Sequence, residues 1–327
     1  MKKTLLSAIV LVAVTAALPW VLGDYGVNLA TEVYIMAILA MSLGLLMGYA
    51  GLVSLGHAAF FGIGAYTVAL LGPAIPSTIV LIALSMVLAG IIAWVTGMIF
   101  IRTSRFYFLM ITVAFGQLIF ALVWQLKSWT GGADGHKVSA PLDFGFGELG
   151  SPLALYAVMA VAMVIVYVFL RVFVNSPAGR IVQGVMDNEN RMTALGYNVR
   201  FYKVLAYTVA GAIAGLAGSL YAYFNLFVSP ELTGWMFSGQ VMMMVIIGGV
   251  GTLMGPAVGA ALFIILQNFI SSYTERWPII LGALLVTLVL VGRGGIVHWV
   301  GLARTKIFVR QKEASLQKSS SGHLYGK

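Results

Sequence analysis

The amino-acid sequence predicts an all-α, polytopic membrane protein. Of its 327 residues, 61% are hydrophobic and only 9% are charged, whereas a soluble domain carries roughly 25% charged residues. So few polar groups cannot cover a globular surface in water. Apolar runs of membrane-spanning length recur along the chain, and basic residues fall in alternate connections between them. Lipid is therefore the predicted solvent for most of the chain.

About ten transmembrane elements are predicted, within a range of eight to ten. A spanning helix needs about 20 mostly apolar residues, and seven runs satisfy this length: 4–22, 29–47, 77–101, 106–126, 152–174, 203–228 and 252–270. Three more runs are short or interrupted by glycine: 52–72, 237–247 and 278–292. The glycine-containing runs predict broken helices.

The first run admits two interpretations. Lys2 and Lys3 precede an apolar stretch that contains Ala16 and Ala17, a pattern that also resembles a cleavable signal peptide. The apolar stretch continues to Leu22 and further spans follow at once. We therefore expect an uncleaved first helix.

The basic residues predict the orientation. If the N-terminus is cytoplasmic and ten elements alternate, all of the 19 lysines and arginines except Lys127, Lys137 and Arg276 lie inside. This agrees with the positive-inside rule and places both termini in the cytoplasm. The net charge of +9 then reflects topology and attraction to membrane lipid at the inner surface, so no nucleic-acid partner is expected.

The connections divide the chain into one transmembrane domain, 1–303, and a tail. Residues 127–151 form the longest predicted outer, periplasmic loop, and residues 175–203 form the longest cytoplasmic loop. The tail, 304–327, is basic and then rich in serine, which is typical of disorder.

Two glycine patterns echo each other. Gly48-x-x-Gly51 and Gly248-x-x-Gly251 each follow an apolar element and open a glycine-rich one. Duplicated halves with broken helices are common in transporters and mark their pathways. Glycine is also frequent in membrane helices generally, so both a duplication and a coincidence remain open.

The cytoplasmic loop predicts two short helices. Ser176 is suited to cap a helix that has Pro177 at its first position, and a second cap lies within 187–190. Gly196 is suited to end the second helix in the left-handed conformation. Four apolar residues recur at helical spacing and need burial against the protein's own helices, lipid or a partner: Ile181, Val185, Met192 and Leu195.

Six blocks in order resemble the branched-chain amino acid permeases of the LivM type, transmembrane subunits of ATP-binding-cassette (ABC) importers. They are GLVSLGHAAFFGIGAY (51–66), YFLMITVAFGQ (107–117), TGGADG (130–135), SPAGRIVQGVMDNENRMTALGYNVRFYKVLAY (176–207), AGLAGSLYA (214–222) and VIIGGVGTLMGPAVGA (245–260). They cover nearly the whole chain. In the wider class the cytoplasmic loop carries E-A-A-x-x-x-G; here Gly196 fits, whereas residues 190–192 are Asn-Arg-Met.

The resemblance implies a permease for branched-chain or other hydrophobic amino acids, or for a related solute such as urea, an amide or an aromatic or short-chain acid. Its partners would be a second permease of the LivH type, two ATPases of the LivG and LivF type and a periplasmic binding protein, all in or at a bacterial inner membrane. The coupling loop would contact an ATPase through Arg180, Asp187, Glu189, Arg191, Leu195 and Gly196.

The sequence independently predicts that the chain is not an ATPase. No G-x-x-x-x-G-K-[ST] phosphate loop occurs in it, so ATP and Mg²⁺ would bind the partner subunits. With no cysteine and few histidines, no metal or other cofactor is expected.

Five polar residues in apolar runs are candidates for the substrate pathway: Ser54, His57, Tyr66, Gln117 and Gln240. His57 is either a pathway residue or a structural one that satisfies a carbonyl freed by a glycine break. The two glutamines could bind substrate or join helices.

One further polar residue bears on the alternative functions. Glu32 is the sole carboxylate in an apolar run, and it is expected near the headgroups. A self-sufficient secondary transporter or channel is the alternative, but it usually needs more intramembrane charge. A membrane enzyme lacks support, because the chain has no paired carboxylates at membrane depth.

Overall fold

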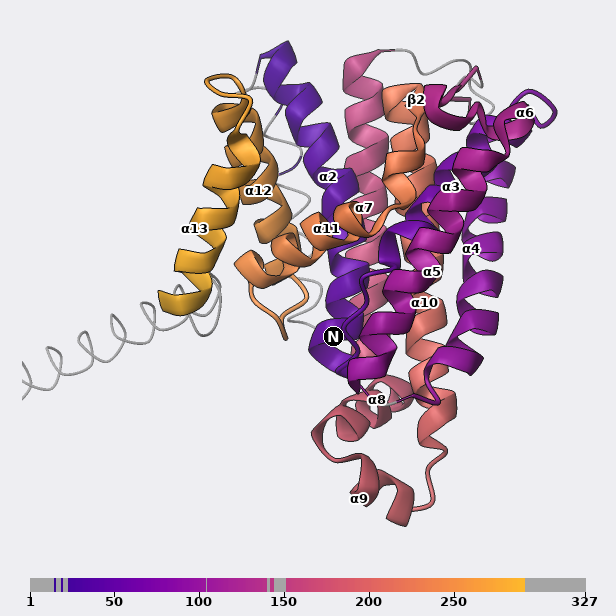
Figure 1. Cartoon of the computed structure of the whole chain (residues 1–327), viewed down its shortest axis with the longest axis vertical. Helices are drawn as coiled ribbons and strands as arrows, with labels where there is room; N and C mark the ends of the chain where they lie inside the picture. Colours follow the sequence, from indigo (N-terminus) through magenta and orange to yellow (C-terminus); the bar gives the residue numbers. More distant parts are fainter. Residues whose placement is uncertain are drawn as a thin grey trace, which may run out of the picture.

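The computed structural model describes Thr15, Pro19 and residues 23–103, 105–139, 142–143 and 151–291. These residues form a bundle of roughly aligned helices (Figure 1), which confirms the all-α prediction. The first predicted span, 4–22, lies outside the described residues apart from Thr15 and Pro19. The tail 304–327 also lies outside them.

Five helices in the described part are long and apolar enough to cross a membrane. They are α2 (Asp24–Leu45, continued by the π-helix η1, Leu46–Ala50), α4 (Thr78–Phe100), α5 (Arg105–Gln125), α7 (Pro152–Asn175) and α10 (Val199–Asn225). Each coincides with a predicted run. The three shorter runs form α3 (His57–Leu71), α11 (Trp235–Gly248) and α13 (Trp277–Val291). The run 252–270, predicted to have full spanning length, forms α12 (Gly255–Ser271), which at 17 residues is shorter than the five long helices.

The two long loops lie at opposite ends of the bundle (Figure 1). The predicted cytoplasmic loop forms α8 (Pro177–Asp187) and α9 (Glu189–Ala194) at one end. At the other end, the predicted outer loop contains α6 (Lys127–Thr130), the 3-10 turn η2 (Gly132–Asp134) and β1 (His136–Lys137). β1 pairs antiparallel with β2 (Phe227–Val228), which is followed by a second 3-10 turn, η3 (Pro230–Thr233). The arrangement agrees with the predicted alternation, while the cytoplasmic position of the termini stays a prediction.

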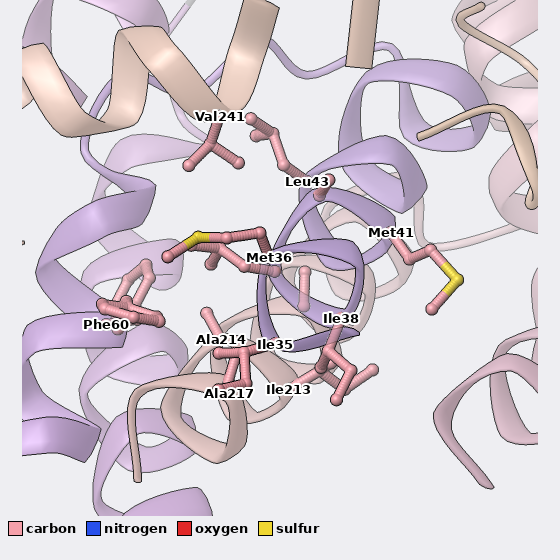
Figure 2. Packing of buried hydrophobic residues seen from close by; sticks show 14 of the residues in the cluster. Ile35, Met36, Ile38, Met41, Leu43, Phe60, Ile213, Ala214, Ala217 and Val241 are labelled. Carbon is pink, nitrogen blue, oxygen red and sulfur yellow. The ribbon is translucent and has the colours of Figure 1, made fainter. Parts of the chain in front are cut away.

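α10 is the central helix and packs extensively against α3, α4 and α2. Figure 2 shows its residues Ile213, Ala214 and Ala217 beside α2, with Phe60 of α3 nearby. Small residues bring the helix axes close, because a Cβ atom added at Gly64 of α3 would overlap the Gly215 carbonyl group of α10. Since lipid is as apolar as these side chains, such close packing is a main source of stability between membrane helices.

The two glycine patterns of the sequence meet in space. A Cβ atom added at Gly48, in η1, would lie 2.6 Å from the backbone nitrogen of Gly251, in the turn after α11. Gly251 has a φ of 100°, which other residues rarely adopt. Gly48 and Gly251, about 200 positions apart, therefore form one backbone contact. Glycine is required at position 48 because a Cβ atom would overlap the facing backbone, and at position 251 because of the positive φ.

Candidate functional site

The start of α3 lies inside the bundle. Residues 51–56 are not helical, so the predicted run 52–72 becomes a helix only from His57. At 15 residues and about 1.5 Å per residue, α3 is too short to cross the roughly 30 Å hydrocarbon core of a membrane. The predicted glycine break is therefore a real interruption, and its freed backbone groups need partners.

Three side chains from three different helices make hydrogen bonds to groups at this interruption. Ser42 of α2 lies 2.7 Å from Nε2 of His57 and also donates to the Leu39 carbonyl group. Thr112 of α5 accepts the Leu55 N–H at 3.2 Å, and Ser238 of α11 accepts the Ala58 N–H at 2.9 Å. The start of α3 is thereby joined to α2, α5 and α11.

His57 is fully buried at this junction. Its Nε2 atom is bonded to Ser42, whereas its Nδ1 atom has no hydrogen-bond partner among the described residues. The ring lies edge-on to Phe60, with centroids 6.0 Å apart. In this conformation His57 connects helices and does not line any of the cavities described below.

Ser54 lies in the same interior region. Its hydroxyl group is buried close to that of Tyr207 on α10, and neither group makes a hydrogen bond of ordinary geometry among the described residues. A buried polar atom without a partner costs about 1–3 kcal/mol. The region around the start of α3 therefore favours a bound water molecule or a movement that pairs these groups.

The other three predicted pathway residues lie elsewhere. Gln117 and Gln240 line one cavity of about 650 Å³ between α5, η3 and the start of α11. Tyr66 lines a second, of about 650 Å³, between α3, α4, α5 and α6, and its buried hydroxyl group has no partner in the described part of the chain. The five candidates thus fall into three places.

Several residues of these places are not evident in the sequence. Ser42 and Ser238 are single serines in apolar runs, which are common and carry no distinctive pattern. Glu231 follows a proline in an outer connection, and its position in the wall of the Gln117 cavity depends on tertiary packing.

The predicted coupling loop, residues 175–203, folds as the sequence predicts. Ser176 accepts the Gly179 N–H at 3.2 Å, and Asn188 accepts the Arg191 N–H at 2.9 Å. Gly196 ends the second helix with a φ of 87°. Local capping signals therefore determine both helices of the loop.

α8 and α9 differ in burial. Val182 and Val185 of α8 are buried against the bundle, whereas α9 has no buried residue. The six predicted coupling residues are all exposed: Arg180, Asp187, Glu189, Arg191, Leu195 and Gly196. α8 therefore attaches the loop to the bundle, and α9 projects from it.

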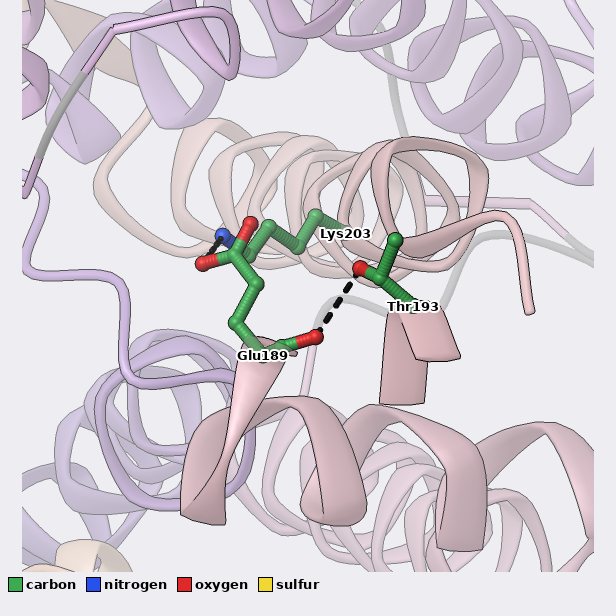
Figure 3. A network of polar contacts seen from close by, with 3 residues as sticks. All are labelled: Glu189, Thr193 and Lys203. Carbon is green, nitrogen blue, oxygen red and sulfur yellow. Dashed lines mark hydrogen bonds and ion pairs between the residues drawn. The ribbon is translucent and has the colours of Figure 1, made fainter. Parts of the chain in front are cut away.

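Two polar contacts orient α9 (Figure 3). The Lys203 ammonium group at the start of α10 lies 2.7 Å from the Glu189 carboxylate. The Thr193 hydroxyl group donates to the Glu189 carbonyl oxygen at 2.9 Å. The ion pair is partly exposed, so it sets an orientation more than it adds stability.

The chain is similar to known permeases along most of its length. It is 28% identical to the high-affinity branched-chain amino acid transport system permease protein LivM of Salmonella typhimurium, over 88% of this chain and 73% of that protein. It is 25% identical to the probable branched-chain amino acid transport permease protein LivM of Methanocaldococcus jannaschii, over 75% of this chain and 81% of that protein.

A more distant similarity links the chain to a second kind of permease. It is 23% identical to the permease protein LivH of Salmonella typhimurium, over 80% of this chain and 90% of that protein. No solved structure shows a significant match. Residues 25–291, which include the interrupted α3, the coupling loop and both cavities, match the profile of the branched-chain amino acid transport system permease component, and the chain belongs to that family.

Proposed function

We propose that the chain is the transmembrane permease subunit of an ABC importer for branched-chain or other hydrophobic amino acids. The observation that carries the proposal is α9, which has no buried residue and is followed by Leu195 with 65% of its surface exposed. An apolar side chain that projects into water at the end of a membrane bundle is suited to a partner's groove. Cytoplasmic ATPases of the LivG and LivF type are the proposed partners.

The similarity to both LivM and LivH permeases supports a pair of related permeases. In the proposed assembly, a LivH-type subunit completes the pathway and a periplasmic binding protein delivers the amino acid. The assembly lies in a bacterial inner membrane with α8 and α9 on the cytoplasmic side. That side agrees with the basic residues of this end, which include Arg171, Arg180 and Arg200.

The mechanism follows from the junction at the start of α3. ATP binding by the partners displaces α8, which is packed on the bundle, and the displacement reaches the spans. Because the start of α3 is bonded to α2, α5 and α11, these helices move relative to one another only if its bonds are exchanged. The unpaired hydroxyl groups of Ser54 and Tyr207 are available for such an exchange.

The test is uptake by the reconstituted assembly. We expect proteoliposomes that contain the full importer and the loaded binding protein to accumulate leucine only with ATP. The permease alone is expected to show no uptake. Uptake by the purified chain without ATP would overturn the proposal in favour of a secondary transporter or channel.

A variant tests the docking surface directly. Replacing Arg191 and Leu195 with alanine should reduce co-purification of the ATPases by at least about tenfold, since interface anchors contribute 2 kcal/mol or more. The matched control replaces Arg276 and Tyr273, an exposed basic and apolar pair at the other end of the bundle, and should leave co-purification unchanged. Equal retention of ATPase by both variants would contradict docking through α9.

A further inference from the structure

The cavity between α5, η3 and the start of α11 is here called the outer groove. It has a volume of about 650 Å³, and its element η3 follows β2, which lies at the end of the bundle opposite α8 and α9 (Figure 1). Gln117, Tyr221, Glu231, Trp235 and Gln240 are among its lining residues, and they come from four different elements. A cavity of this size suits a small solute.

Three polar side chains of the outer groove have no partner within the described part of the protein. The amides of Gln117 and Gln240 make no hydrogen bond there, and the Glu231 carboxylate forms no ion pair there. No lysine, arginine or histidine is among the lining residues. The groove therefore presents an uncompensated negative charge beside two free amides.

The neighbouring surface is apolar. Leu118 and Leu122 of α5 are 57% and 46% exposed, as is expected of side chains that face lipid. A glutamine in the same lipid environment would lose its hydrogen bonds to water at a cost of several kcal/mol. The exposed Gln117 thus marks the face of α5 where water or a polar solute replaces lipid.

Aromatic rings form the rest of the wall. Phe120, Tyr221, Trp235 and Phe237 line the groove, and such rings bind apolar side chains and attract cations. The Glu32 carboxylate of α2 lies near enough to the Tyr221 hydroxyl group to interact with it electrostatically. The Glu32 side chain, which is half-buried, therefore lies close to the Tyr221 hydroxyl group of the aromatic wall.

We propose that the outer groove receives an amino acid with its ammonium group at Glu231 and its apolar side chain against the aromatic wall. The amides of Gln117 and Gln240 supply donors for its carboxylate group. The inference rests on the proposed function and adds to it a residue that selects for a positively charged amino group. Loss of the ammonium group from the substrate would leave the Glu231 charge without a partner.

The test uses a thiol placed in the groove. The chain has no cysteine, so Ser229→Cys, at a lining position that the proposed contacts do not use, introduces the sole thiol of this subunit. In the assembled importer, the thiol reacts with a trimethylammonium methanethiosulfonate or with its sulfonate counterpart. The rate with each reagent is divided by the rate of the same reagent with a small free thiol. We expect this relative rate to be about tenfold higher for the cationic reagent, because charged clefts concentrate counter-ions. L-Leucine should slow both reactions.

Matched variants isolate the cause. Glu231→Gln should abolish the excess preference for the cation and the protection by leucine, whereas Glu275→Gln, an exposed acid in the α12–α13 connection, should change neither. Leu118→Cys, on the apolar face of α5, should react at least about tenfold more slowly with both reagents than the groove thiol, because a lipid-facing thiol is poorly ionised.

A steric variant provides an independent measurement. Gly234 lines the groove with a φ of −74°, and a Cβ atom there would make an ordinary contact of 3.4 Å with the Glu231 carbonyl oxygen. Gly234→Leu should therefore fill the groove without backbone strain and abolish leucine protection, whereas Gly234→Ala should retain it.

Three results would overturn the inference. The first is equal relative rates for the two reagents, and the second is a preference for the cation that survives Glu231→Gln. The third is a thiol that becomes unreactive when the second permease assembles with this chain, whether or not leucine is present. The last result would mean that a protein surface fills the groove. Failure of the unmodified importer to take up leucine with ATP would instead overturn the proposed function, so the two failures are distinct.

Discussion

The contact between Gly48 and Gly251 yields a prediction with a calculable size. In Gly48→Ala, the new Cβ atom would lie 2.6 Å from the Gly251 nitrogen, whereas ordinary contacts begin near 3.4 Å. The two backbones must therefore separate by about 0.8 Å. Because the obstacle is backbone and not a side chain, no rotamer change can relieve it.

The expected cost combines two terms. Overpacking by one methyl group costs about 1–3 kcal/mol, and alanine recovers up to about 1 kcal/mol through its helix preference. The net loss is about 1–2 kcal/mol. Gly90→Ala on α4 is the matched control, because its Cβ atom would meet the Ala212 side chain at 3.4 Å without overlap. It should gain up to about 1 kcal/mol.

The assay is thermal unfolding of the purified protein in detergent, followed by size-exclusion chromatography. The two variants should differ by about 1–3 kcal/mol, which corresponds to roughly 2–12 °C in Tm. A Gly48→Ala protein as stable as the Gly90→Ala protein would refute the reasoning. It would show that the turn after α11 shifts freely and that the two glycine patterns do not constrain each other.

Three further predictions concern the junction and the loop. His57→Ala removes a fully buried ring and its bond to Ser42, so we expect a loss of about 3 kcal/mol and a reduced yield of assembled complex on size-exclusion chromatography; normal assembly with lost uptake would instead indicate a pathway role. Neutralising Glu189, Lys203 or both in a double-mutant cycle should give a coupling energy below about 1 kcal/mol, since the pair is partly exposed; a larger value from unfolding in denaturant would contradict this. A Cβ atom at position 196 would meet no neighbouring atom, but the backbone there has a φ of 87°. Gly196→Ala should therefore lower the free energy of unfolding by about 1 kcal/mol through backbone strain alone, which is measured as a lower Tm; an unchanged Tm would mean that the turn rearranges.

Local signals in the sequence predict much of the fold. Spans and their order follow from the length of the apolar runs, and the two loop helices follow from Ser176, Asn188 and Gly196. These features depend on residues a few positions apart. Burial of Val185 and exposure of Leu195 did not follow from their common spacing, because only the position of the bundle decides which side of the loop is covered.

The candidate site could be predicted only in part. Glycines and His57 mark the interruption before α3, but its partners Ser42, Thr112 and Ser238 come from helices that are distant in sequence. Gln117 illustrates the same limit. A glutamine amide can join two helices or line a groove, and the sequence does not distinguish these roles. The packing of η3 and α11 beside Gln117 shows that it lines a groove.

The junction at the start of α3 also has a consequence for biosynthesis. The Ala58 amide is bonded to Ser238, 180 residues further along the chain. At about 5–20 residues per second, a ribosome needs roughly 10–35 s to synthesise that interval. During this time the start of α3 lacks one of its three tethers, so the nascent N-terminal half is an incomplete structure in the membrane. The start of α3 therefore completes its hydrogen bonds only after α11 has been synthesised.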